Sequence, residues 1–252
     1  MTGGSDESDR VEVWYQATHD LLGYDVWSML PALSEEERQH SERFQFAEDR
    51  RDYVAAHALL RRALSGLLGG RPQDWRFVSG PHGKPELVHD QAPYQVSLSH
   101  SRGFVACAIT RAGPVGIDTE IVDPSVNVEQ IAARFFSPRE NELLATSTAE
   151  ARHENFTALW TLKEAVVKAL GTGLTIDLST FTIELAGKGD LIFQPPPDQI
   201  GHPWNLALFT PIQSHCLAIA VRSGAILDYT VQIWNSQPHQ RMIIPERTLV
   251  PA

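Results

Sequence analysis

The chain has 252 residues, of which 42% are hydrophobic and 21% are charged, and its formal net charge is −10. This composition is typical of a globular protein with one large domain or two small ones. The negative charge argues against non-specific nucleic-acid binding, which needs a basic surface to displace phosphate counterions. No apolar run approaches the roughly 18 residues of a membrane span, so we expect no contact with a membrane.

The beginning of the chain and its cysteines indicate the compartment. Residues 1–10 are polar and acidic, unlike a signal or transit peptide, so we expect a disordered leader and a cytoplasmic protein. Cys107 and Cys216 each lie inside an apolar, strand-like run. This position favours small buried side chains over a disulfide framework or a zinc site.

The first half of the chain predicts one strand, two helices and three further strands. Ser34 and Glu37 have the spacing of a capping box, which predicts a helix that continues through Phe44. A longer helix is predicted from Asp49 to about Leu68. The expected strands cover residues 11–15, 75–78, 94–100 and 104–110, with turns at 79–85 and 101–103.

The second half repeats this order. A strand is expected at residues 115–120, and a helix at 156–170 with an apolar stripe of Leu159, Leu162, Val166 and Ala169. Residues 171–173, Gly-Thr-Gly, end that helix. Strands are expected at 181–185, 204–209 and 216–221, with a turn at 187–189.

The repeated order of helix, strand, glycine-lysine turn and two strands suggests a duplication. We therefore predict an α+β fold with two similar halves, residues 1–112 and 113–236, followed by an extended tail at 237–252. Two such halves would form a cleft between them, and clefts of this kind are favoured ligand sites. The acids of the second half and the polar residues of the first would then face one ligand.

Two acids in the predicted strand at 115–120 are candidates for a metal site. Asp118 and Glu120 are two residues apart, so both side chains leave the same face of a strand. A hard cation such as Mg²⁺ would remove their mutual repulsion, and it commonly takes its remaining ligands from waters and substrate phosphates. A strand end with two solvated acids explains this fragment equally well.

The helix at 156–170 carries a second polar group. Trp160, Glu164 and Lys168 are spaced four residues apart, so they share one face. Glu164 and Lys168 also fit an ordinary surface ion pair, and taken alone this is the better explanation. The tryptophan on the same face and the adjacent Lys163 favour a site.

Basic and hydroxyl residues of the first half could bind an anion. Arginines gather at positions 43, 50, 51, 61 and 62, where either solvated helix faces or an anion site is expected. Ser99 and His100 lie at a strand end, where they could be structural or could hydrogen-bond a phosphate. Lys84 lies in the turn between Gly83 and Pro85.

Taken together, these residues resemble the motifs of 4′-phosphopantetheinyl transferases. Residues 96–101 (Val-Ser-Leu-Ser-His-Ser), 116–120 (Gly-Ile-Asp-Thr-Glu) and 160–168 (Trp-Thr-Leu-Lys-Glu-Ala-Val-Val-Lys) resemble the three family motifs. Residues 83–85 and 134–137 match further signature positions. The length and the duplication resemble the Sfp-type, pseudodimeric members, whose fold has pseudo-twofold symmetry.

The resemblance implies a transfer reaction. Coenzyme A would bind in the cleft with Mg²⁺, or alternatively Mn²⁺, on its diphosphate. A serine of an apo acyl or peptidyl carrier protein would attack the phosphate nearer the pantetheine, and adenosine 3′,5′-bisphosphate would leave. By motif position, the metal ligands would be Asp118, Glu120 and Glu164. The catalytic set would be Glu164, Lys168 and His100, and the coenzyme contacts would be Arg51, Lys84, Ser99, His100 and Lys168.

The individual roles are also expectations from the resemblance. Glu164 is ranked as a metal ligand above its role as general base, because a metal-bound carboxylate is a weak base. Family members often have an arginine at the position of Asp52, so Arg51 is assigned the basic contact in that helix. Carrier proteins are typically acidic, so a basic and apolar docking patch is expected near residues 135–144 and Lys163. A monomer is expected.

Two other classes of function remain open at this stage. One is a coenzyme A or nucleotide-binding module without activity, although the intact set of acids and Lys168 argues against a decayed site. The other is a Mg²⁺-dependent hydrolase that uses the same acids with water as the nucleophile.

Overall fold

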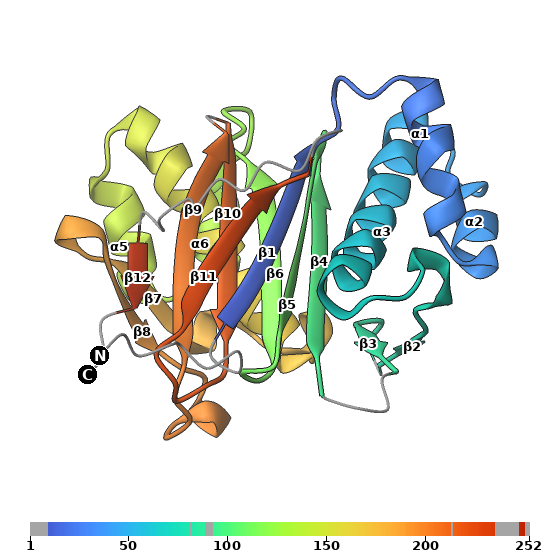
Figure 1. Cartoon of the computed structure of the whole chain (residues 1–252). Helices are drawn as coiled ribbons and strands as arrows, with labels where there is room; N and C mark the ends of the chain where they lie inside the picture. The colour runs from blue at the N-terminus through green and yellow to red at the C-terminus, as the bar shows by residue number, and fades with distance from the viewer. Residues whose placement is uncertain (1–9, 81, 89–92, 213, 235–246, 250–252) are drawn as a thin grey trace.

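The protein is an α+β molecule with two mainly antiparallel sheets flanked by helices (Figure 1). The computed structural model describes residues 10–80, 82–88, 93–212, 214–234 and 247–249. The predicted disordered leader lies almost entirely outside these residues, and so does most of the predicted tail.

The first sheet has the strand order β11-β1-β5-β4. Its strands are β11 (Asp228–Ile233), β1 (Arg10–Ala17), β5 (Phe104–Thr110) and β4 (Gln95–Ser101). Neighbours are antiparallel except β1 and β11, which are parallel. A separate short hairpin consists of β2 (Phe77–Ser79) and β3 (Pro85–Leu87).

The second sheet has the order β6-β10-β9-β12-β8-β7. Its strands are β6 (Val115–Ile121), β10 (His215–Val221), β9 (Asn205–Ile212), β12 (Arg247–Leu249), β8 (Asp190–Gln194) and β7 (Thr182–Leu185). The sequence predicts no strand at residues 228–233, which fall in the predicted second half, yet they form β11 and pair with β1 of the first half. Residues 247–249 of the predicted tail form β12, which lies between β9 and β8.

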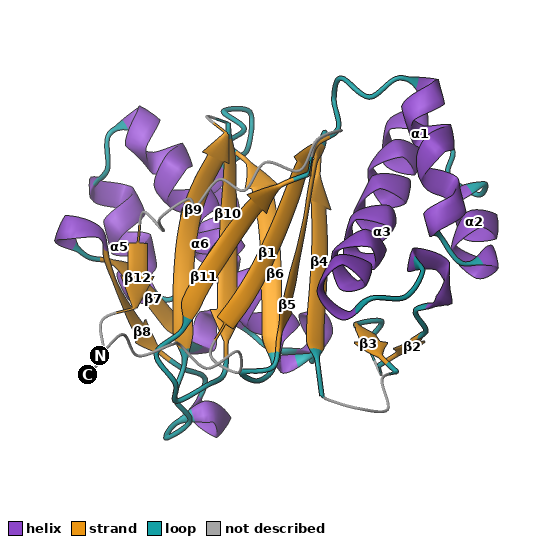
Figure 2. Ribbon diagram, in the orientation of Figure 1, coloured by secondary structure: helices purple, strands orange, loops and turns teal. Residues whose placement is uncertain are grey.

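The described residues form six α-helices, which lie on the faces of the sheets (Figure 2). They are α1 (Gly23–Met29), α2 (Glu35–Ser41), α3 (Ala47–Leu68), α4 (Val128–Phe135), α5 (Pro138–Thr146) and α6 (Ala149–Leu170). Short 3-10 turns cover Leu30–Ala32, Pro72–Asp74, Gly173–Thr175, Leu178–Thr180, Gly187–Gly189 and Pro197–Gln199.

The repeated order predicted from the sequence is a structural repeat. Helix α3 precedes the antiparallel strands β4 and β5 and packs on them, and β1 lies beside β5. Helix α6 correspondingly precedes β9 and β10, and β6 lies beside β10. Both helices have 22 residues. The α+β prediction with two similar halves is therefore confirmed.

Alternation along the strands divides the interior into three cores. On β5, one set of side chains packs towards α3, whereas Phe104, Ala106 and Ala108 pack towards the other sheet. On β10, Leu217 and Ile219 face the first sheet, while alternate residues face α6. This follows from the two-residue period of a strand. Cys107 and Cys216 are buried in the two helix-facing cores, as predicted.

Two predicted helices differ from the observed ones at an end. The capping box of Ser34 and Glu37 is present, but α2 ends at Ser41 instead of continuing through Phe44. The aromatic ring of Phe44 then packs back on His40 and Tyr53. Helix α6 begins at Ala149, earlier than predicted. The prediction missed its first turns because they are polar and show no apolar periodicity.

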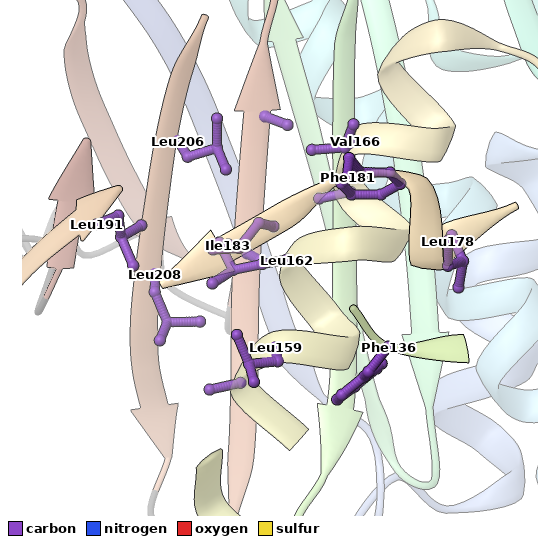
Figure 3. Close-up of a cluster of buried hydrophobic side chains, with 14 of the residues drawn as sticks. Phe136, Leu159, Leu162, Val166, Leu178, Phe181, Ile183, Leu191, Leu206 and Leu208 are labelled. Atoms are coloured by element: carbon purple, nitrogen blue, oxygen red, sulfur yellow. The ribbon is translucent and has the colours of Figure 1, made fainter. Parts of the chain in front are cut away.

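The core behind α6 confirms the predicted apolar stripe (Figure 3). Leu159, Leu162 and Val166 are fully buried against residues such as Phe181 and Ile183. The stripe holds the inner face of α6 on the second sheet. Its opposite face is thereby free to present polar residues beside β6.

The expected docking role of Lys163 is wrong. Its side chain is 0% exposed, and its ammonium group lies 2.9 Å from Glu140 and donates to two backbone carbonyls. The ammonium also lies 4.2 Å from the ring centroid of Phe181. Lys163 is four residues after Leu159 and three before Val166, so it belongs to the buried face of α6. A buried charge of this kind requires a partner, which Glu140 provides.

Candidate active site

Helix α6 lies unusually close to β6 at Gly116. A Cβ atom at this position would lie 1.9 Å from the Ala165 carbonyl oxygen and 2.4 Å from the Ala169 nitrogen. Only glycine permits this approach of a helix backbone to a strand. The close packing brings Asp118 of β6 beside the polar face of α6.

Asp118, Lys168 and Ser99 form one hydrogen-bonded group from three elements. The Lys168 ammonium donates to Asp118 Oδ1 at 2.7 Å and to Ser99 Oγ at 2.9 Å. The Ser99 hydroxyl also donates to Asp118 Oδ1 at 2.9 Å. Ser99 comes from β4 of the first half, so the group joins both halves of the molecule.

The other two predicted acids adjoin this group. Burial and the charge of Asp118 raise the pKa of Glu120, although Ser101 donates a hydrogen bond to its Oε2 at 3.0 Å. Burial, with the charges of Asp118 and Glu120, raises the pKa of Glu164 to about 7, against the opposing charge of Lys168. These mutual effects show that the three carboxylates share one electrostatic environment.

A cavity of about 430 Å³ is lined by most of the predicted site residues. Its lining residues are Leu98, Ser99, His100, Asp118, Glu120, Trp160, Glu164 and Lys168. The structure therefore brings together all three predicted metal ligands, the predicted catalytic lysine and histidine, and the face of α6 that carries Trp160.

The donors in this cavity fit a hard divalent cation. Asp118 Oδ2 and Glu164 Oε1 are buried oxygens that lack a hydrogen-bond partner, a costly arrangement that a cation would relieve. Among the described residues, no three acidic, histidine or cysteine side chains are gathered closely enough to form a ready-made cation site. The Lys168 ammonium occupies the other oxygen of this carboxylate, Asp118 Oδ1.

A larger cavity, about 1240 Å³, adjoins the first and is lined by both halves. The two cavities share Leu98, Glu164 and Lys168. Lys84 also lines the larger cavity, but its ammonium donates to the Val115 carbonyl at 2.9 Å and to the Ala169 carbonyl at 3.4 Å. Burial lowers the pKa of Lys84 to about 8, against the charge of Glu86.

An ionic network in the wall of the larger cavity was missed by the sequence analysis. Glu37 accepts from Arg61 Nε at 2.7 Å and lies 3.0 Å from His57 Nδ1. Burial alone would raise the pKa of Glu37, but His57 and Arg61 lower it to about 2. The capping-box role of Glu37 gave no indication of this second use, because its partners lie in α3.

Arg51 is the predicted coenzyme contact that the structure does not bring to either cavity. Its Nε donates to Asp52 at 3.1 Å, and it is absent from both linings. Asp52 in turn accepts hydrogen bonds from the Thr18 hydroxyl and from the Gly103 backbone at 2.9 Å. The acid at this position therefore joins α3 to the β4–β5 turn.

The described chain has no helix with both the length and the hydrophobicity needed to cross a bilayer.

Comparisons with families and curated proteins point to one class of enzyme. Residues 114–220 match the family model described as the 4′-phosphopantetheinyl transferase superfamily, and residues 23–111 match the model described as 4′-phosphopantetheinyl transferase, N-terminal. The chain is 33% identical over 216 residues to the 4′-phosphopantetheinyl transferase HetI of a Nostoc species, which covers 85% of this chain and 88% of HetI. It is 32% identical over 164 residues to the 4′-phosphopantetheinyl transferase Sfp of Bacillus subtilis, with coverage of 65% and 71%.

The solved structures that are similar to this chain include two holo-[acyl-carrier-protein] synthases. The Thermotoga maritima protein has 26% identity and a TM-score of 0.35, with coverage of 45% of this chain and 64% of that chain. The Helicobacter pylori protein, in complex with coenzyme A, has 19% identity and a TM-score of 0.35, with coverage of 43% and 99%. The two matched family models span both halves of the fold, and HetI aligns with most of the chain. The chain therefore belongs to the 4′-phosphopantetheinyl transferase family.

Proposed function

We propose that the protein transfers the 4′-phosphopantetheine group from coenzyme A to a serine of an apo acyl or peptidyl carrier protein. The observation that carries this proposal is the convergence of Asp118, Glu164 and Lys168 in the smaller cavity, because Glu164 and Lys168 also line the larger one. Family membership supplies the reaction class, and the larger cavity offers space lined by both halves for an extended ligand.

Asp118, Glu120 and Glu164 are proposed to hold Mg²⁺, with Mn²⁺ as an alternative ion. The two partnerless buried oxygens and the all-oxygen donor set support this assignment. When bound, the ion would neutralise part of the negative charge on the diphosphate. Lys168 would supply a second positive charge to the diphosphate, for which it would exchange its present contact with Asp118.

The transfer forms a bond between the carrier serine oxygen and the phosphorus nearer the pantetheine. The bond from that phosphorus to the bridging diphosphate oxygen breaks, and adenosine 3′,5′-bisphosphate leaves with the electron pair. Glu164 is the candidate acceptor of the serine proton, because its raised pKa makes it a stronger base than an ordinary carboxylate. We still rank it first as a metal ligand.

The nucleotide side of coenzyme A is assigned to the larger cavity, where Lys84 is a proposed contact. Ser99 and His100 are proposed contacts from the adjoining smaller cavity, and His100 completes the catalytic set with Glu164 and Lys168. Arg51 would have to leave Asp52 to join them. A cytoplasmic location and a monomeric state also belong to the proposal.

Mass spectrometry of an apo carrier incubated with the enzyme, coenzyme A and Mg²⁺ tests this function. Transfer adds one phosphopantetheine to the carrier and is abolished by a metal chelator. Cleavage of coenzyme A without carrier would instead identify a diphosphate hydrolase. An unmodified carrier and intact coenzyme A across a panel of fatty-acid, polyketide and peptide carriers would indicate a binding module.

A further inference from the structure

Alternate serines of β4 connect the two halves of the molecule. The strands β4 and β6 belong to different sheets, yet they lie side by side, with many residue contacts between them. Ser97 Oγ accepts a hydrogen bond from the Ile117 backbone at 3.1 Å. Ser99 and Ser101, further along the same face of β4, donate instead to carboxylates of β6. Serine hydroxyls thus make hydrogen bonds between β4 and β6 in place of some of the backbone hydrogen bonds of a continuous sheet.

Glu120 and Asp118 are held differently. Asp118 has a lysine and Ser99 at one of its oxygens. Glu120 accepts from Ser101 Oγ at 3.0 Å, and the nearby charge of Asp118 repels it. A glutamate at the end of a strand has several rotamers, and this repulsion favours those that turn away from Asp118. The Ser101 hydroxyl opposes that movement.

Ser101 is itself fixed by buried contacts. Its residue is 9% exposed, and its carbonyl oxygen lies 3.3 Å from His215 Nε2 on β10. The other ring nitrogen, Nδ1, lies 3.0 Å from Ser214 Oγ, and the ring stacks on Phe104 at 5.1 Å. Burial lowers the pKa of His215, so the neutral ring can donate from Nε2 to the Ser101 carbonyl and accept at Nδ1.

We propose that Ser101 is a positioning residue that orients Glu120 toward the divalent cation, and that His215 holds the Ser101 backbone in place for this task. The inference rests on the proposed function, because it presupposes that Glu120 is a metal ligand. It assigns to the third hydroxyl of the Ser-Leu-Ser-His-Ser stretch a task separate from nucleotide contact. Groups that orient metal ligands commonly contribute strongly to metal affinity.

Direct Mn²⁺ binding by the full-length protein, followed by electron paramagnetic resonance, tests the inference without an activity readout. We expect Ser101→Ala to weaken Mn²⁺ binding by about 10- to 100-fold, the usual effect of losing such a partner. Ser101→Thr keeps the hydroxyl and should restore most of the affinity. Ser125→Ala is the matched control, because it removes a hydroxyl that donates to Asp123 at 2.6 Å on the exposed surface.

A second comparison separates a positioning role from a merely structural one. In a Glu120→Gln background, Ser101→Ala should cause little further loss of Mn²⁺ affinity, because its effect passes through Glu120. Equal losses in both backgrounds, or wild-type affinity in Ser101→Ala, would overturn the inference. The proposed metal site itself fails if wild-type protein binds Mn²⁺ no better than Asp118→Asn, and this outcome is distinct from the others.

Discussion

The carboxyl group of Glu164 combines burial with the repulsion of two other acids. Both effects raise its pKa to about 7, and Lys168 opposes them only in part. The metal-free site therefore contains a carboxyl that is partly protonated near neutral pH. Metal binding requires the ionised form, so the ion and the proton compete for the same oxygens.

Raising the pH from about 6 to about 8 should tighten Mn²⁺ binding roughly tenfold as Glu164 ionises. The sign follows from the direction of the shift. A carboxyl with a raised pKa is still largely protonated at pH 6, and the proton must leave before the ion can bind. Titration calorimetry in buffers of different ionisation enthalpy would also detect the released proton. Glu164→Gln should bind the ion weakly and with little pH dependence, and equal wild-type affinities at both pH values would contradict the assignment.

Lys163 shows that the residue next to Glu164 has a structural task. Its ammonium is paired with Glu140, which also accepts a hydrogen bond from the Ile183 backbone at 2.8 Å. Burial lowers the pKa of Lys163, and the charge of Glu140 opposes this effect. The pair joins α5, α6 and the start of β7 behind the site.

Lys163→Met should destabilise the protein by about 3–5 kcal/mol, because it leaves the Glu140 charge buried without its partner. Urea unfolding followed by circular dichroism measures the loss. Adding Glu140→Gln to this variant should recover part of the stability, since no uncompensated charge then remains. A fully stable Lys163→Met protein with a raised KM for carrier would restore the docking role that the structure excludes.

At the level of elements, the contact between β6 and α6 sets the geometry of the site. Gly116 permits the two backbones to approach, and the apolar stripe of α6 presses the helix onto the sheet. Asp118, Glu164 and Lys168 then meet without any loop between them. Sites on regular elements hold their side chains more rigidly than sites on loops.

Gly116→Ala should force α6 away from β6 and reduce kcat/KM by about 100-fold, the typical effect of misplacing reacting groups by about 1 Å. Carrier modification followed by mass spectrometry gives the rate. Gly66→Ala in α3 is a suitable control, because an added Cβ there meets nothing within 4 Å. Normal activity in Gly116→Ala would show that the close approach is not needed.

Helices α2 and α3 are joined by Glu37 and its partners. Arg61 donates both to Glu37 and to the carbonyls of Pro72 and Trp75, so one guanidinium ties α3 to two other segments. The lowered pKa of Glu37 means that its ionised form stabilises the folded state.

The contribution of the ionised Glu37 to the free energy of unfolding should be fully present above its ordinary pKa of 4.5 and lost as the pH falls through about 2. Its size is on the order of 3 kcal/mol, from the shift in pKa. Chemical unfolding at several pH values should therefore show that wild type has a larger free energy of unfolding than Glu37→Gln, and that this difference disappears in acid. Glu35→Gln, at an exposed position of the same helix, should show no such pH-dependent difference. A pH-independent difference for Glu37→Gln would refute the explanation.

For the whole molecule, net charge must be reconciled with partner binding. A protein of charge −10 repels an acidic carrier unless positive groups are gathered locally. Lys163, Phe136 and Leu144 are buried and cannot contribute to the predicted patch. Arg134 and Arg139 remain exposed on α4 and α5, so these two arginines now define the proposed docking patch.

Arg139→Glu should raise the KM for carrier several-fold at low salt while leaving the KM for coenzyme A unchanged. The effect should shrink as ionic strength rises, because exposed charges are screened. Steady-state kinetics at two salt concentrations measure both constants. Arg71→Glu is a matched charge reversal at an exposed residue of the first half. An equal effect of both substitutions would reject a local docking patch.

Local pattern alone determined much of this protein. The spacing of residues in α6 located both its buried stripe and the polar face with Trp160, Glu164 and Lys168, because side chains three or four residues apart lie on the same face of a helix. The capping box located the start of α2. The repeated order of elements predicted two similar halves, since each half reads as the same local sequence of helix, turn and strands.

Tertiary structure decided the contacts between residues that no local period connects. Helical spacing puts Lys163 on the buried face of α6, but Glu140, the acid that compensates its charge, lies 23 positions earlier in α5. The pairing of β11 with β1 joins residues 228–233 to residues 10–15. The meeting of Ser101 with Glu120, and of Glu37 with Arg61, likewise depends on how elements pack. Packing is a property of the assembled chain, because burial and charge compensation exist only once distant surfaces have met.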